Sequence, residues 1–210
     1  MLKLIFVRHG ETVWNREERL QGRKDVRLSV LGKKQAELLA ERFRGEKIDV
    51  IYSSNLSRAL ETAKTIAKFH PKAPVKIKRE LSERSHGVIE GLTLEEIKAK
   101  PKLRKLLDWE KMKSQDFKFP KGESKAELKE RVKNFLEDIT RSHRCGTLLV
   151  VCHGGVIRAA LEILLRKSDT TLSDLHFKNA SVTILTLKGK EAKLEVLNDT
   201  SHLQKENQNR

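Results

Sequence analysis

Two histidines in this sequence have the same local setting, because each ends an apolar run and stands directly before a glycine. His9 occurs in LIFVRHGETVWN, residues 4–15, and His153 occurs in LLVVCHGG, residues 148–155. The apolar runs predict buried strands of a parallel sheet, and parallel sheets bind ligands at the carboxyl ends of their strands. A single histidine at a strand end is most often structural, whereas this repeated arrangement predicts a site that both histidines share.

Two arginines accompany the histidines. Arg8 immediately precedes His9, and Arg58 lies in SSNLSRALETA, where Asn55 is predicted to cap a helix that follows another strand. Guanidinium forks suit the oxygens of a phosphate, and helix N-termini after Asn55 and Gly155 would add N–H donors. A neutral imidazole can attack phosphorus to form phosphohistidine, and a second one can stabilise the charge on the transferring group. These residue types predict phosphoryl transfer in a pocket that uses no metal and no cofactor.

The same chemistry requires an acid. The leaving alkoxide must gain a proton and the water that later attacks phosphohistidine must lose one, so a single carboxyl can act as acid and then as base. The candidates near these segments are Glu11, Glu80, Glu83 and Glu90. Each could equally be a solvated charge or an ion-pair partner, and residue types alone do not choose among them.

Short apolar runs alternate with helical patterns along the chain. Thr93 with Glu96, and Ser124 with Glu127, predict capping boxes at two of the helix starts. Strands are predicted at 2–7, 48–52, 75–77 and 147–151, helices at 31–43, after residue 55, after 93, after 124 and at 156–165, and a closing hairpin at 181–187 and 193–197. The alternation predicts an α/β fold, a three-layer α/β/α sandwich with a mostly parallel central sheet.

The segment at about 93–121 differs from the rest of the chain. It is basic, contains Trp109, Phe117 and Phe119, and shows weak periodicity. We expect a small helical insertion that lies over one edge of the sheet. The chain is predicted to form a single catalytic domain at 1–203, followed by a polar, disordered tail at 204–210.

The chain is strongly basic. Its 210 residues include 44 Lys and Arg against 29 Asp and Glu, a formal net charge of +15. A nucleic-acid partner, a charged surface of the heat-adapted kind and attraction of a phosphorylated small molecule would each fit this charge. The basic residues interleave with acids and no zinc-finger spacing occurs, so we expect a small phosphorylated metabolite and no nucleic acid.

Other classes of protein are also disfavoured. No apolar run approaches the roughly 20 residues of a membrane span, and the first run is too short for a signal peptide, so a cytoplasmic protein without a membrane partner is expected. Cys145 and Cys152 do not make a disulfide framework, and Cys152 is expected to be a small buried hydrophobe. Their spacing with nearby histidines matches no common zinc pattern. Edge strands of small α/β enzymes often pair, so a homodimer stays among the expectations.

Four segments together resemble the histidine phosphatase superfamily, which has the phosphoglycerate-mutase-like fold. They are RHGETVWN, SSNLSRALETA, ELSERSHGVIEGL and CHGG, and the resemblance runs from residue 2 to about residue 203. It implies that His9 is the phosphorylated nucleophile, that Arg8 and Arg58 bind the transferring group, and that His153 is the second histidine of the phosphate pocket. It also selects Glu83 as the proton donor from among the four carboxyls.

The resemblance extends to residues around the reacting group. It implies that Asn15, Gln21 and Gly22 line the pocket and that the backbone N–H of Gly154 faces the phosphate. His86 departs from the tyrosine that the mutases of this family usually have; we expect a solvent-exposed ring, with recognition of an anionic or hydroxyl group as the alternative.

Two further expectations concern the loop after the nucleophile. Glu11 is expected to orient this loop rather than to donate a proton. Gly10 is expected to let the backbone turn without a side chain that would crowd the phosphoryl group.

The family includes mutases and phosphatases. Its mutases usually carry a longer insertion with an arginine pair, whereas the region 92–125 here is short and has a single Arg104. The element FPKGESKAEL at 119–128 is similar to the phosphatase branch. We therefore expect a metal-independent phosphomonoesterase that acts through phosphohistidine, with a bell-shaped dependence of kcat/KM on pH. The alternatives are a cofactor-dependent phosphoglycerate mutase and a non-catalytic phosphate-binding module.

Overall fold

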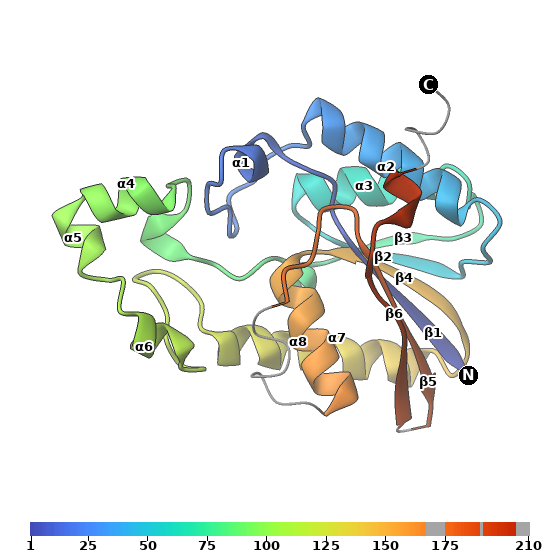
Figure 1. Cartoon of the computed structure of the whole chain (residues 1–210). Coiled ribbons are helices and arrows are strands. Elements are labelled where there is room, and N and C mark those ends of the chain that lie inside the picture. Colours follow the sequence, from blue (N-terminus) through green and yellow to red (C-terminus); the bar gives the residue numbers. More distant parts are fainter. Residues whose placement is uncertain (167–174, 190, 205–210) are drawn as a thin grey trace.

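The computed structural model describes residues 1–166, 175–189 and 191–204, in which six strands form one sheet. The strands are β1 (Leu2–Arg8), β2 (Val50–Ser54), β3 (Val75–Lys78), β4 (Gly146–Cys152), β5 (Val182–Lys188) and β6 (Glu191–Asp199). Their order is β3-β2-β4-β1-β5-β6, with the first four parallel. The hairpin of β5 and β6 adds antiparallel strands beside β1, so the predicted mostly parallel sheet with a closing hairpin is confirmed (Figure 1).

Helices cover both faces of this sheet (Figure 1). On one face lie α2 (Val30–Phe43) and α3 (Ser57–Ala67), and on the other lie α7 (Lys125–Ser142) and α8 (Gly154–Leu165). Successive residues of a strand point to opposite faces, so Ile5 packs with α2 and α3, whereas Leu4 and Phe6 pack with α7 and α8. Both clusters are buried, and the predicted three-layer sandwich is confirmed.

Capping residues explain where two helices begin. Thr93 and Ser124 both form the predicted capping boxes, which open α4 (Leu94–Ala99) and α7. The prediction that Asn55 caps α3 is wrong, because the N-cap of this helix is Leu56, whose side chain makes no cap hydrogen bond. The Asp25 carboxylate, from a distant loop, accepts from the backbone N–H of Ser57 at 2.7 Å and takes over the capping.

The segment between η2 (Gly87–Ile89) and α7 is helical, as predicted, with α4, α5 (Pro101–Arg104) and α6 (Trp109–Lys113). The predicted position over a sheet edge is wrong. Ile89, Ile97 and Phe119 form a separate small core with Leu20 from the loop after α1 (Val13–Arg16), and none of the residues of this core comes from a strand. The insertion extends away from the strands beyond α1 (Figure 1).

The described chain ends on α2. After β6, η3 (Ser201–Leu203) buries His202, whose Nδ1 lies 2.9 Å from an Arg42 nitrogen; the same guanidinium pairs with Asp199 at 2.6 Å. Of the predicted tail, all but Gln204 falls outside the described residues. Within the described part, no helix combines the length and apolarity that a bilayer span requires.

Acidification should weaken this anchor. Because Arg42 can only donate, Nδ1 of His202 must accept, and burial followed by the charge of Arg42 lowers the pKa of His202 from 6.5 to about 4. The unfolded chain therefore binds more protons between these values, and the contribution to stability is lost as pH falls from 6.5 towards 4. His202→Gln keeps an acceptor but does not titrate, so its free energy of unfolding should fall less steeply over this range than that of the parent. Equal slopes in urea titrations of both proteins would contradict the prediction.

Candidate active site

The pairing of β1 with β4 brings the two histidines together. Arg8 is paired with Cys152 at the ends of these strands, so His9 and His153 follow as the next residues on adjacent parallel strands. The backbone N–H of His9 donates to the Cys152 carbonyl at 3.1 Å, and the two imidazole centroids lie 5.1 Å apart. The structure therefore brings the two histidines together at the carboxyl edge of the sheet, as the sequence predicted.

Hydrogen bonds assign the tautomer of His9. Its Nδ1 lies 2.7 Å from the Gly10 carbonyl, which can only accept, so Nδ1 carries the hydrogen. Its Nε2 is then a lone-pair nitrogen, and it accepts from Nε of Arg58 at 3.2 Å. The ring is 3% exposed. Nε2 is therefore the nitrogen that is available as a nucleophile.

Arg58 is a fully buried cation beside this nitrogen. Besides the bond to His9, its Nη1 donates to the Lys24 carbonyl and its Nη2 to the Gly22 carbonyl, both at 2.8 Å. Gly22 has φ +49°, a conformation that suits glycine and that turns the loop towards the guanidinium. These bonds to carbonyl oxygens satisfy the buried charge and fix its position next to Nε2.

A cavity of about 290 Å³ opens at these residues. The predicted residues that line it are Arg8, His9, Asn15, Gln21, Gly22, Arg58, Glu83, His86 and Gly154. Arg8 donates to the Phe177 carbonyl through Nη1, while its Nε is buried without a partner in the described part of the chain. The amide oxygen of Gln21 is likewise buried and unpartnered. The cavity thus has cationic and polar walls around the nucleophilic nitrogen.

His153 lies beside this cavity and does not line it. Its ring is fully buried, with Nε2 2.9 Å from Ser54 Oγ and Nδ1 without a partner among the described residues. Because Ser54 Oγ already accepts from the Leu56 N–H at 3.3 Å, its hydrogen can be donated to Nε2. Nδ1 of His153 would then carry a hydrogen, as a donor to an oxyanion requires.

Of the four carboxyl candidates, Glu83 alone lines the cavity. Its Oε2 accepts from the Gly155 N–H at 3.2 Å and its Oε1 from the Arg84 N–H at 2.8 Å. Glu11 instead accepts from Ser29 Oγ at 2.7 Å, at the start of α2, which agrees with the expected role in the loop.

The reason for a glycine at position 10 differs from the expected one. A Cβ on Gly10 would lie 2.4 Å from the Gly32 carbonyl oxygen, because the loop passes directly against the first turn of α2. A Cβ on Gly32 would in turn lie 1.9 Å from the Glu11 carbonyl oxygen. Gly10 therefore permits close packing of the loop on α2, and crowding of a phosphoryl group is not what excludes a side chain there.

The expectation of a solvent-exposed His86 is wrong. The residue is half-buried and lines the cavity, and burial followed by the charge of Arg84 lowers the pKa of its ring. Asn15 behaves differently from a simple wall residue, because its Oδ1 completes the capping box of α1 with Thr12.

Sequence reasoning missed several residues of the site. His176, Phe177 and Arg158 line the cavity, and Asn179 donates from its amide to the His9 carbonyl at 3.2 Å. Arg158 had a usable signal, because it follows His153 into a helix much as Arg58 follows β2. The other three precede β5 in a stretch without a motif, so only the sheet topology brings them to the site.

Burial controls the charge states of the site. Desolvation, followed by the charges of Arg58 and Arg8, lowers the pKa of His9 well below 6.5. Desolvation, followed by the charge of Arg58, does the same to the pKa of His153. The pKa of Arg58 falls to about 10, so this guanidinium stays cationic at neutral pH. The site pairs neutral imidazoles with fixed cations, which is the combination that attack on a phosphoryl group needs.

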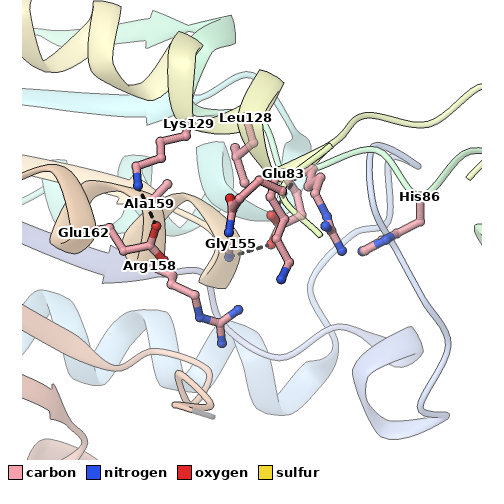
Figure 2. Close-up of a pocket in the computed structure, with 11 residues that line it drawn as sticks. Glu83, His86, Leu128, Lys129, Gly155, Arg158, Ala159 and Glu162 are labelled. Carbon is pink, nitrogen blue, oxygen red and sulfur yellow. Dashed lines mark hydrogen bonds and ion pairs between the residues drawn. The ribbon is translucent and has the colours of Figure 1, made fainter. Parts of the chain in front are cut away.

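A second cavity of about 200 Å³, whose lining residues are drawn in Figure 2, shares walls with the first. Glu83, His86, Gly155 and Arg158 line both cavities. The second has four cationic side chains and two carboxylates in its described walls: Arg84, Lys125, Lys129, Arg158, Glu83 and Glu162. Glu162 is paired with Lys129 at 3.2 Å, so the net charge around this space is positive.

A mostly parallel sheet thus presents a histidine, the buried Arg58, the half-buried Arg8 and a carboxyl to one cavity, a set of groups suited to phosphoryl transfer. The model of the histidine phosphatase superfamily (branch 1) matches residues 4–200, and the chain belongs to this superfamily. Phosphoserine phosphatase 1 of Hydrogenobacter thermophilus is 37% identical, with 97% of this chain and 95% of that protein covered. Phosphoglycerate mutase-like protein 4 of Arabidopsis thaliana is also 37% identical, with 96% and 87% covered.

Solved structures agree with this assignment. A phosphoserine phosphatase variant from Entamoeba histolytica, in complex with phosphoserine, superimposes with a TM-score of 0.82 at 30% identity. The match covers 97% of this chain and the whole of that one.

The lowered pKa of His9 predicts an observable charge state. A histidine with an ordinary pKa would be largely protonated at pH 5.5, about one unit below 6.5, whereas His9 should remain neutral there. Nitrogen-15 NMR of the imidazoles should show a protonated Nδ1 and a lone-pair Nε2 for His9 at this pH, assigned by loss of the signals in His9→Ala. Accordingly, the limb of the kcat/KM profile that belongs to His9 of the free enzyme should lie below pH 6.5.

An imidazolium signal of His9 at pH 5.5 would contradict both the assignment of the charge state and the explanation by burial. The reverse tautomer would contradict both the role of the Gly10 carbonyl and the assignment of Nε2 as the nucleophilic nitrogen.

Proposed function

We propose that this protein is a metal-independent phosphomonoesterase that acts through a phosphohistidine on a small phosphorylated metabolite. The observation that carries the proposal is the Nε2 lone pair of His9, held by Gly10 and Arg58 at the wall of a cavity that also contains Glu83. Cytoplasmic location and homodimer formation stay predictions from the sequence.

The reaction has two displacements. Nε2 of His9 attacks phosphorus, the bond from phosphorus to the leaving oxygen breaks, and Glu83 protonates that oxygen. Water then attacks the phosphohistidine, Glu83 takes its proton, and the phosphorus–nitrogen bond breaks to release inorganic phosphate. Arg8 and Arg58 stabilise the charge on the phosphoryl oxygens in both steps. The family resemblance also implies His153 as a donor, from its buried position beside the cavity.

The second cavity supports a substrate class. Glu83 lies in the wall of this second cavity. A leaving group whose oxygen receives a proton from Glu83 would therefore extend into the second cavity. The excess of cationic side chains there favours a leaving group with a negative charge of its own. Phosphoserine and 3-phosphoglycerate carry such a group, and structures of an Entamoeba histolytica phosphatase contain these two molecules.

Mutase activity is the second candidate, because one relative is a phosphoglycerate mutase-like protein. Given 3-phosphoglycerate with 2,3-bisphosphoglycerate, the protein should release inorganic phosphate and form little 2-phosphoglycerate, since the proposed acceptor is water. Activity should persist in EDTA, and His9→Ala should lose at least about 10³-fold, as expected for removal of a covalent nucleophile.

Efficient isomerisation with little free phosphate would contradict the proposed phosphatase activity and identify the protein as a mutase. Hydrolysis by His9→Ala at the parental rate would contradict the assignment of His9 as the nucleophile. Absence of turnover across a wide panel of monoesters, with retained phosphate binding, would favour the non-catalytic module.

Arg158 should act on the leaving group. Its guanidinium lines both cavities and donates to the Leu175 carbonyl at 2.6 Å. Loss of one charge-assisted hydrogen bond is worth about 1.5–3 kcal/mol, so Arg158→Gln should lower kcat/KM for 3-phosphoglycerate roughly 10- to 100-fold. The value for p-nitrophenyl phosphate, whose leaving group has no carboxylate, should change less than about threefold.

Arg166→Gln is the matched control, because Arg166 is an exposed residue at the opposite end of α8. Equal losses on both substrates in Arg158→Gln would assign this arginine to the phosphoryl group instead.

A further inference from the structure

Two arginines from distant parts of the chain donate to one carbonyl, that of Glu83. Arg23, in the loop that holds Arg58, reaches it through Nε at 3.3 Å. Arg131, on α7, reaches it through Nη2 at 3.2 Å and also donates from Nη1 to the Glu80 carbonyl. The backbone of the proposed proton donor is therefore held from two sides.

One carboxylate joins these arginines. Glu123 accepts from Nε and Nη2 of Arg131 at 2.7 and 2.9 Å, a bidentate pair, and from Nη2 of Arg23 at 2.8 Å. The side chains of Glu123 and Arg131 are 11% and 16% exposed. We name these three residues, Arg23, Glu123 and Arg131, the guanidinium clamp.

The clamp holds a segment of the chain whose backbone is not fixed by a strand or helix. Glu83 lies between η1 (Arg79–Leu81) and η2, outside any strand or helix that would fix its backbone. The Glu123 N–H donates to the Ser85 carbonyl at 2.9 Å, which ties the same segment to the start of α7. On the opposite side, the Gly155 N–H holds the carboxylate of Glu83. The backbone and the carboxylate of this residue are thus anchored independently.

An ordinary surface ion pair would have little consequence. The clamp differs in the bidentate geometry and low exposure of the Glu123–Arg131 pair and in the convergence of two donors on a single carbonyl. Glu123 lines neither of the two cavities, so it does not touch the substrate. Positions of reacting groups matter at the scale of an ångström, so a shift of this segment would misplace the proton donor.

We propose that the guanidinium clamp positions Glu83 for proton transfer to the leaving oxygen, with Glu123 as its central residue. The proposal rests on the proposed function, in which Glu83 is the proton donor. It makes Glu123 and Arg131 positioning residues, whose loss acts through Glu83 alone.

The leaving group supplies the test. An alkyl phosphate such as glycerol 3-phosphate needs protonation of its leaving oxygen, whereas p-nitrophenyl phosphate releases an acidic phenol that needs it far less. Glu123→Ala should lower kcat/KM for the alkyl ester about 10-fold or more, and that for the aryl ester less than about threefold. Glu123→Gln keeps one acceptor and should recover part of the loss.

A double-mutant cycle separates positioning from general disruption. Glu83→Gln should itself lower kcat/KM for the alkyl ester selectively. If the clamp acts through Glu83, then adding Glu123→Ala to Glu83→Gln should change the value by less than about twofold. Glu46→Ala, which breaks the ion pair with Lys3 at 2.8 Å, is the control for loss of a carboxylate. Urea titrations verify that each variant is folded.

Two results would overturn the proposed role of the clamp. One is an equal loss of kcat/KM on both esters in Glu123→Ala. The other is a loss of kcat/KM that is as large in the Glu83→Gln background as in the parent. If Glu83→Gln alone leaves the ratio of the two esters unchanged, the assignment of the proton donor fails and the clamp with it. If Glu123→Ala does not fold, Arg23→Gln removes one arm at a side chain that is 45% exposed, and the same selective loss, smaller in size, is expected. Unchanged selectivity in a folded Arg23→Gln would then overturn the proposal.

Discussion

The parallel register of β1 and β4 is the constraint on which the site depends. Because Arg8 is paired with Cys152, each strand ends at the same level and each continues into a histidine and a glycine. Both strands are buried on both faces, and a shift by one residue would exchange every core side chain between the two layers. Hydrophobic packing of the sheet therefore sets the register that places the two imidazole centroids 5.1 Å apart.

A buried charge shapes the loop that faces these strands. Arg58 is 1% exposed, and burying a cation without partners would be strongly destabilising. Carbonyls of Gly22 and Lys24 turn inward to meet it, which in turn places Asp25 at the N–H of Ser57, the first residue of α3, and Arg23 at the carbonyl of Glu83. One short loop thus connects the phosphoryl-binding cation, a helix cap and the backbone of the proposed proton donor.

Features encoded locally were predictable from the sequence, and features decided by competing contacts were not. Strand ends, capping boxes and the histidine–glycine pairs are local patterns, and the structure has them. Asn55 has the right residue type for a cap, but Asp25, distant in the sequence, occupies the helix start instead. His86 looked exposed because no local signal reveals that the segment around it forms part of the walls of two cavities. The insertion has its own small core, which its weak periodicity did not disclose.

Gly10, Gly154 and Gly155, which follow the two histidines, are required for three different reasons. A Cβ at Gly155 would lie 2.4 Å from Glu83 Oε1, so a side chain there would displace the carboxylate from its helix-end N–H. Gly10 is required by α2, as the contact with Gly32 shows. Among the described residues, a Cβ at Gly154 would meet only the Cβ of Phe177, at 4.0 Å. No atom of the described residues therefore excludes a side chain at Gly154, but this residue lines the cavity where the phosphoryl group would lie. Steric exclusion by the ligand, first expected at Gly10, therefore fits Gly154 instead.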